Sequence, residues 1–448
     1  MRRVLLILLV LIVLAGGATI AISFHHPPMR LMPPPAVFLD ERASVILEGA
    51  TDPEIPLFYA TNRVPRGPAE DPDYARSAGA PLNLGELTIR IGDDATTLDR
   101  IFEWSTRASD DPRPYLHLQS VTQQATMPPD APPGEAAAAW FAALDAAVAA
   151  SRDKDVIIYV HGANTTLERA AGQAAQLQHF TGRDAVVVLF AWPTAENFLL
   201  YSRDMRTAAE AAPQFARLVE LIGENTSAKK IDVFTYSAGG TVGSDGLAIV
   251  GRDAAASGTD PRLGEVYHAA PDADFRTFVD DMKDYAGRAT RTTVAANMRD
   301  SALRLSAFVN NASRAGRPDM AELSDEATEF LLRATDDYGL ELLRVRPENM
   351  YGLSNFSHTF WYDDPWVSSD VLFTLLHHLS PEARGLEEGE SAIGGHYYTF
   401  TPDYPTRLSA VIDQLRQSGA IAPGDPLLPE EAPPSAPVPE APAPEAGE

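Results

Sequence analysis

The chain has 448 residues, of which 45% are hydrophobic, and it carries a formal net charge of −26 with no cysteine. This length suits either two to three domains or one large domain with tails. An acidic surface repels phosphate backbones, so we expect no nucleic-acid partner, and the absence of cysteine excludes disulfides, thiolate catalysis and cysteine-ligated metals.

Residues 1–24 have the pattern of a membrane-targeting segment. Arg2 and Arg3 precede an uncharged run from Val4 to Phe24, close to the ~20 residues that a membrane-spanning helix needs. A cleaved secretory signal has a shorter apolar core, which residues 4–15 also fit. We favour an uncleaved anchor. Either interpretation places the rest of the chain outside the cytoplasm, because positive residues stay inside. We therefore expect a cell-envelope protein with a periplasmic domain on a single inner-membrane helix, or a secreted protein if the signal is cleaved.

Two further segments differ in composition from the middle of the chain. Residues 25–54 are rich in proline and predict a spacer. Residues 423–448 consist largely of proline, alanine and glutamate, which leave little to bury, so we expect a disordered tail. One domain over residues 55–422 remains.

Within this domain, β-prone apolar runs alternate with helical patterns. The expected strands are residues 56–61, 87–91, 156–160, 185–190, 230–234, 265–268 and 291–296, and the expected helices are residues 136–151, 167–180, 202–222 and 369–379. Buried strands separated by helices indicate a mostly parallel sheet covered on both faces. The predicted fold class is therefore α/β, with a doubly wound sheet.

The segment from Ile231 to Gly240 carries the strongest chemical signal. A β-prone run leads into Ser237, which is flanked by small residues and followed by a helical pattern. A strand, tight turn and helix of this kind expose a serine hydroxyl to a base and to a substrate carbonyl. The usual pattern is G-x-S-x-G, and Thr235 stands in the first glycine position. The alternative is a glycine-rich turn or a phosphate-binding loop.

A second loop, His161-Gly162-Ala163, follows the strand at residues 156–160. A glycine here allows backbone N–H groups to face the site, so we expect the amides of Ala163 and Ala238 to form an oxyanion hole. The alternative is an ordinary strand-to-helix turn. Trp192 fits either a pocket wall or the core. Four residues are predicted to line the substrate pocket: His161, Asn164, Trp192 and Tyr236.

A catalytic serine needs a histidine base and an acid that fixes its tautomer. Asp300 follows a late strand and is our preferred acid, with Asp272 as the alternative, although Asp272 after proline also suits a helix N-cap. His358 lies in a loop before a helix and is the preferred base, with His396 as the alternative.

Together, these blocks resemble the α/β-hydrolase superfamily, and most of all a bacterial esterase/lipase-like subfamily of largely unassigned function. The resemblance rests on the order of residues 58–63, 160–164, 190–193, 201–204, 235–239, 270–272, 300–306, 358, 369–371 and 384–385. It implies Ser237 as nucleophile, Asp300 as acid and His358 as base. Thr235-Tyr236 departs from the family pattern, and residues 316–343 look longer than that pattern and are a candidate lid.

We therefore predict a serine hydrolase that cleaves a small-molecule or lipid-like ester, or an amide, through an acyl-enzyme. One alternative is a catalytically silent scaffold that binds a lipid, cell-wall or protein partner, and another is an acyltransferase with the same triad. We expect no cofactor and no metal: the sequence has no H-E-x-x-H motif, and His377 and His378 are adjacent and point to different helix faces.

Overall fold

The computed structural model describes residues 26–38, 52–109, 111–350, 352–391 and 394–418. The predicted membrane segment, residues 1–24, and the predicted tail, residues 423–448, lie outside the described residues. Among the helices that the structure describes, none is both long enough and apolar enough to cross a membrane.

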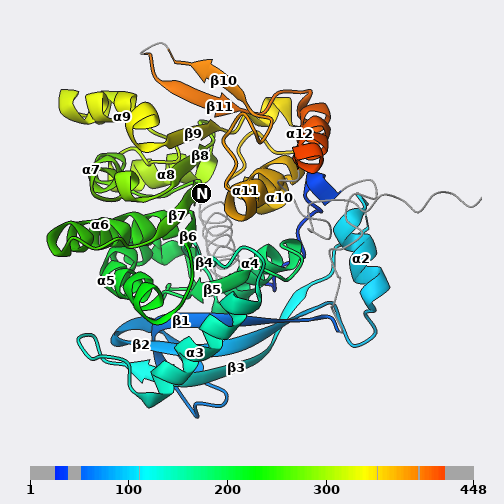
Figure 1. The fold of residues 1–448 in the computed structure, drawn as a ribbon, viewed down its shortest axis with the longest axis vertical. Helices are drawn as coiled ribbons and strands as arrows, with labels where there is room; N and C mark the ends of the chain where they lie inside the picture. The colour runs from blue at the N-terminus through cyan, green and yellow to red at the C-terminus, as the bar shows by residue number, and fades with distance from the viewer. Residues whose placement is uncertain (1–25, 39–51, 110, 351, 392–393, 419–448) are drawn as a thin grey trace, which may run out of the picture.

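An 11-stranded sheet forms the centre of the molecule, in the order β10-β11-β9-β8-β7-β6-β4-β5-β1-β2-β3 (Figure 1). The parallel strands are β1 (Glu54–Arg66), β4 (Val156–Val160), β5 (Val186–Phe190), β6 (Ile231–Tyr236), β7 (Leu263–Ala269), β8 (Arg291–Ala296), β9 (Leu340–Arg344) and β11 (His396–Thr399). Antiparallel strands extend both edges: β2 (Asp73–Ile91), β3 (Leu116–Met127) and β10 (Glu387–Glu390).

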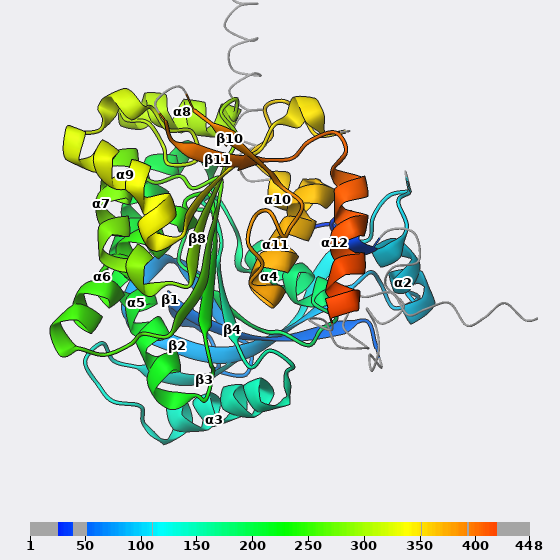
Figure 2. The same cartoon turned by 45° about the horizontal axis from the view of Figure 1, so that its top comes forward.

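Helices cover both faces of this sheet (Figure 2). One face packs against α2 (Leu98–Thr106), α4 (Leu167–Phe180), α10 (Phe360–Asp363), α11 (Pro365–His377) and α12 (Tyr404–Ser418). The other packs against α3 (Glu135–Ala150), α5 (Tyr201–Asn225), α6 (Gly239–Ser257), α7 (Phe275–Tyr285) and α9 (Asp325–Tyr338). Every residue of β4, β5 and β6 is buried, as expected for strands with helices on both faces.

The predicted α/β class, a mostly parallel sheet flanked by helices, is confirmed. β4 and β6 are parallel neighbours, and Val160 pairs with Thr235 at their carboxyl ends. Because of this register, the loop after β4 and the turn after β6 lie side by side. Bringing these two turns together is what positions the candidate site.

The spacer prediction is wrong for residues 26–38. Met29, Leu31, Val37 and Phe38 are buried in the core, and the ring of Phe38 stacks on Phe180 with their centroids 5.8 Å apart. The prolines suggested an extended linker, but the apolar residues between them have enough surface to pack against the body.

The lid prediction for residues 316–343 is also wrong. This segment contains α9 and most of β9, and β9 pairs in parallel with β8. Ala327 and Ala334 of α9 are buried in the hydrophobic core between this helix and the sheet. The segment is therefore a regular helical crossover followed by a sheet strand.

Candidate active site

Ser237 lies in the turn between β6 and α6. Its φ of 54° is in the left-handed region, where a non-glycine residue is uncommon and marks a constrained turn. The turn leaves no space at its two glycines: a Cβ at Gly239 would lie 2.5 Å from the Val160 carbonyl oxygen, and one at Gly240 would lie 2.7 Å from the Pro271 Cβ. The small residues after the serine are therefore a steric requirement.

Thr235 replaces the first glycine of the usual motif, and the structure explains how it fits. A Cβ at Gly243 of α6 would lie only 2.4 Å from the Thr235 Cγ2, so the missing side chain at Gly243 provides the space that Thr235 occupies. The Thr235 hydroxyl is 2.7 Å from Nδ1 of the buried His268. The departure from the motif is accommodated without displacing the serine.

Three residues that are distant in the sequence form a hydrogen-bonded chain at this turn. His358 Nε2 lies 2.8 Å from Ser237 Oγ, and His358 Nδ1 lies 2.6 Å from Asp300 Oδ2. Asp300 is fully buried, and its other carboxylate oxygen accepts the backbone N–H of Leu303 at the start of α8 (Ser301–Asn310). The carboxylate is thus fixed by the helix it caps.

Asp300 and burial have opposite effects on His358. Burial favours the neutral imidazole, but the hydrogen bond and the negative charge of Asp300 outweigh it and raise the pKa of His358 above its usual value of 6.5. The ring of Tyr236 packs against the imidazole, with centroids 5.4 Å apart. Asp300 therefore favours the protonated imidazole, and Asp300 and Tyr236 together fix its orientation.

Neither of the two alternative residues takes part in this chain of hydrogen bonds. Asp272 Oδ1 accepts from Arg314 Nε at 2.6 Å and from Ser306 Oγ at 2.7 Å, and Oδ2 accepts from the Tyr201 hydroxyl at 2.6 Å. Its backbone N–H donates to the Ser237 carbonyl. Asp272 thus supports the turn from behind. The alternative N-cap role is wrong for Asp272, because the residue that caps α7 is Asp274.

His396 begins β11 in the hairpin at the sheet edge, and its Nδ1 pairs with Glu388 at 2.7 Å. It is 44% exposed at its side chain and makes no contact with Ser237. Gly394 and Gly395, which precede it, are hydrogen-bonded to Ser391 at the end of the hairpin.

The loop after β4 lies directly against Ser237. A Cβ at Gly162 would lie 2.9 Å from Ser237 Cβ and 3.4 Å from Ser237 Oγ. Within the described part of the chain, neither Ala163 nor Ala238 donates its backbone N–H to a protein acceptor. Two amides next to the serine are therefore available to an oxygen of a bound molecule.

Two buried charged residues hold the loops around the site, and sequence reasoning assigned neither a role. Asp204, at the start of α5, accepts the N–H of Asn164 at 2.8 Å and that of Ala195 at 2.6 Å. Arg63, at the end of β1, donates to the carbonyls of Thr165 and Trp192, and pairs with Glu196 at 3.0 Å. In the sequence, the only indication of a role was that both residues belong to segments on which the family resemblance rests.

The pocket prediction is wrong for His161 and Trp192. Both side chains are fully buried, their rings are stacked 5.3 Å apart, and the Trp192 indole donates to the His161 carbonyl. The two stacked rings therefore support the loop after β4 from inside the core. Tyr236 is 6% exposed and packs on His358, whereas Asn164 is half-buried in a left-handed conformation with φ of 52°.

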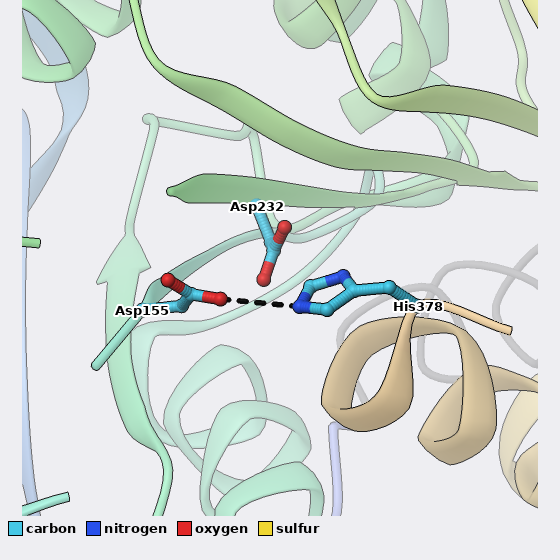
Figure 3. Close-up of side chains that lie close together, drawn as sticks. All are labelled: Asp155, Asp232 and His378. Carbon is cyan, nitrogen blue, oxygen red and sulfur yellow. Dashed lines mark hydrogen bonds and ion pairs between the residues drawn. The ribbon is translucent and has the colours of Figure 1, made fainter. Parts of the chain in front are cut away.

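The cluster of potential metal ligands that the structure holds, Asp155, Asp232 and His378, lies elsewhere (Figure 3). Asp155 precedes β4 and Asp232 is the second residue of β6, so the cluster is at the amino-terminal edge of the parallel strands, whereas Ser237 follows their carboxyl ends.

The fold, with a serine at the sharp turn after a central parallel strand, defines the class of the α/β hydrolases. Residues 136–337 match a family model described as an alpha/beta hydrolase of unknown function. The predicted resemblance to this superfamily is confirmed over that range, which is just under half of the chain. The matched range includes Ser237 and Asp300.

The solved structures that the chain matches at low identity include hydrolases and esterases. A predicted CIB-like hydrolase from Thermoplasma acidophilum is 14% identical over 51% of this chain and 88% of its own, with a TM-score of 0.28. A structure from a study of two fungal esterases of Rhizomucor miehei is 11% identical over 81% and 94%, with a TM-score of 0.31. A hyperthermophilic esterase from Pyrobaculum calidifontis is 14% identical over 59% and 74%, with a TM-score of 0.24. No curated protein matches the chain.

Proposed function

We propose that this protein is a serine hydrolase that cleaves esters through an acyl-enzyme, with Ser237 as nucleophile, His358 as base and Asp300 as the orienting acid. The observation that carries the proposal is the pair of hydrogen bonds, 2.8 Å from Ser237 Oγ to His358 Nε2 and 2.6 Å from His358 Nδ1 to Asp300 Oδ2. A serine hydroxyl is a weak nucleophile until a neighbouring base accepts its proton.

The geometry supports the following sequence of steps. Ser237 Oγ attacks the ester carbonyl carbon while His358 Nε2 takes its proton, and Asp300 stabilises the imidazolium that forms. The N–H groups of Ala163 and Ala238 bind the negative oxygen of the tetrahedral intermediate. His358 then protonates the leaving alcohol, and a water molecule, activated by the same imidazole, releases the acid and restores the serine.

Exposed apolar side chains on the segments that border the site favour an apolar ester. Leu305, Phe308 and Val309 are spaced along one face of α8, and Phe308 is 85% exposed. Phe356, two residues before His358, is 55% exposed, and its carbonyl accepts the N–H of Ser301. Exposed apolar surface of this kind marks an interaction site.

A separate apolar surface is the wall of a cavity of about 550 Å³ that residues of α7, α9, the sheet and the β10–β11 hairpin line. Ala296 and Met298, which connect β8 to Asp300, form part of its wall, and Val294, Leu331 and Leu342 line its interior. We propose that the acyl chain of the substrate contacts these surfaces, so that long-chain esters react faster than acetate.

The test is covalent labelling of the full-length protein with a fluorophosphonate probe, together with hydrolysis of p-nitrophenyl esters. Wild type should be labelled once, and Ser237→Ala should lose both the label and the activity, because the attacking oxygen is gone. Ser257→Ala, at the exposed end of α6, is the matched control and should behave as wild type. A folded wild type without label would refute the hydrolase proposal and favour the silent scaffold.

The chain-length proposal is tested separately with Phe308→Ser. This variant should lower kcat/KM for p-nitrophenyl octanoate several-fold and leave kcat/KM for p-nitrophenyl acetate within twofold of wild type. The reason is that only the longer acyl chain gains from burial against this apolar surface. An equal effect on both esters would contradict an acyl-binding role for α8. An acyltransferase would instead give product ester or amide when an alcohol or amine acceptor is added.

A location outside the cytoplasm, with attachment through residues 1–24, is proposed on the sequence of that segment alone. A reporter fused after residue 448 should be active in the envelope and should remain with membranes after a salt wash. Recovery in the soluble cytoplasmic fraction would overturn this proposal and would leave the catalytic proposal unaffected.

A further inference from the structure

Two buried aspartates and a half-buried histidine form a cluster at the amino-terminal ends of the central strands, whereas Ser237 follows their carboxyl ends. Figure 3 shows the three side chains. Asp155 precedes β4, Asp232 is in β6, and His378 follows the last turn of α11. One ligand atom from each of the three lies within 4.8 Å of the others. In Figure 3 the carboxylates and the imidazole converge on a common space.

Each aspartate uses one oxygen for the protein backbone and turns the other toward the cluster. Asp155 Oδ1 accepts the N–H of Lys230, and Asp232 Oδ1 accepts the N–H of Glu265 at 2.6 Å. Asp155 Oδ2 lies 3.1 Å from His378 Nε2. Asp232 has no exposed surface, and among the described residues its Oδ2 has no hydrogen-bond partner.

A third buried carboxylate increases the negative charge. Glu265 is fully buried in β7, and its Oε1 lies 3.4 Å from His378 Nδ1. Its nearest arginine, Arg291, is 3.7 Å away and is shared with Glu341 at 3.2 Å. Because burying a charge without a partner is costly, three carboxylates beside one imidazole are balanced either by protonation of a carboxylate or by a further positive charge.

The backbone of His378 provides a separate sign that its side chain is needed here. The residue caps α11 with φ of 50° and ψ of 36°, a left-handed position at which helices usually carry glycine. A histidine at this position places an imidazole between Asp155 and Glu265, at the cost of the more favourable glycine.

We propose that this cluster binds a divalent transition-metal ion, with Zn²⁺ the preferred ion, through Asp155 Oδ2, Asp232 Oδ2 and His378 Nε2. A mixed set of carboxylate and imidazole ligands suits zinc, whereas calcium and magnesium take oxygen ligands. Glu265 faces the other imidazole nitrogen, the position from which a carboxylate orients a metal-bound histidine.

The proposed ion is structural, because it lies at the edge of the sheet away from Ser237. It would connect β4 and β6 to the end of α11, whose chain segment also carries His358. No metal was expected from the sequence, because His377 and His378 are adjacent; Asp155, just before β4, and Asp232, in β6, are far from them along the chain. The inference does not rest on the proposed hydrolase activity.

The test measures metal content and thermal stability of the full-length protein. EDTA-treated wild type, dialysed against Zn²⁺ and then against buffer, should retain one zinc per chain by plasma mass spectrometry. Zinc at hundredfold excess over its Kd should raise Tm by about 5 °C, because a ligand that binds only the folded state stabilises it.

Two variants and a matched control separate a metal site from an internal ion pair. His378→Asn keeps a residue that tolerates the left-handed backbone but removes the imidazole, and Asp232→Asn removes the unpartnered carboxylate. Both should lose the zinc and the Tm response, whereas His377→Asn, one residue away, should retain both.

Three results would overturn the proposal. These are failure of wild type to retain zinc, zinc retention by both Asp232→Asn and His378→Asn, and a Tm for Asp232→Asn above that of zinc-loaded wild type. The last result would mean that the buried charge is simply relieved by neutralisation.

Discussion

Gly162→Ala tests whether the loop after β4 sets the position of the nucleophile. The new methyl group would lie 2.9 Å from Ser237 Cβ and 3.4 Å from Ser237 Oγ, which is several tenths of an ångström closer than carbon atoms pack. Because Gly162 does not have a positive φ, alanine fits its backbone, and the strain falls on the contact with Ser237. Either the serine or the loop that carries the Ala163 amide must move.

The expected loss follows from that displacement. A shift of about 1 Å at a reacting group costs about 10²-fold in rate, and loss of one oxyanion donor costs about 10²–10³-fold. We therefore expect kcat to fall by about 10²-fold with KM changed less than threefold, at a stability cost of about 1–3 kcal/mol from overpacking.

The assay is hydrolysis of p-nitrophenyl butyrate, with Tm measured on the same samples. Gly223→Ala is the matched control: a Cβ there meets side chains no closer than 3.7 Å, so activity should be unchanged and the helix slightly more stable. Activity of Gly162→Ala within threefold of wild type, with an intact fold, would refute the reasoning that this loop positions the serine.

Three further predictions concern charged groups. Since His358 must be neutral to act as a base and its pKa is raised above 6.5, kcat/KM should fall as pH falls, with a midpoint above 6.5 in a pH–rate profile; Asp300→Asn should move that midpoint down and lower kcat by about 10⁴-fold. Arg63→Met should lower the free energy of unfolding by about 3 kcal/mol in urea titrations, because the carbonyls of Thr165 and Trp192 lose their buried donor and Glu196 keeps only Arg76 among the described residues; an unchanged midpoint would contradict this. Burial and the nearby Asp245 raise the pKa of Asp281 to about 8, so its contribution to stability is present below about pH 4 and is lost as pH rises through about 8. Asp281→Asn should therefore stabilise the protein at pH 9, by about 2 kcal/mol given its partial exposure, and a lower Tm at that pH would count against the argument.

The strands and helices that alternate in the middle of the chain could be predicted because each has its own strong pattern. The expected strand at residues 156–160 and the expected helix at residues 167–180 coincide with β4 and α4. β2 and β3 were predicted poorly because edge strands alternate polar and apolar residues and lack a continuous apolar run. β9 was missed because it follows an unusually long segment that suggested a lid.

Some features of the candidate site could likewise be predicted from the sequence, and others could not. Ser237, Asp300 and His358 were selected from chain order and local motif, and the structure brings their side chains together. Pocket-lining roles for His161 and Trp192 were predicted wrongly, because a sequence does not say which face of a loop points to solvent.

The sequence alone determined the alternation of the elements, the small residues around Ser237 and the absence of any cysteine chemistry, because these depend on residue type and short spacing. Only the tertiary structure decided that Asp300 rather than Asp272 meets the histidine, that Arg63 and Asp204 hold the loops, and that Asp155, Asp232 and His378 converge at the opposite edge. The physical reason is that a contact between distant segments depends on the register and order of the strands, and these are set by packing of the whole sheet.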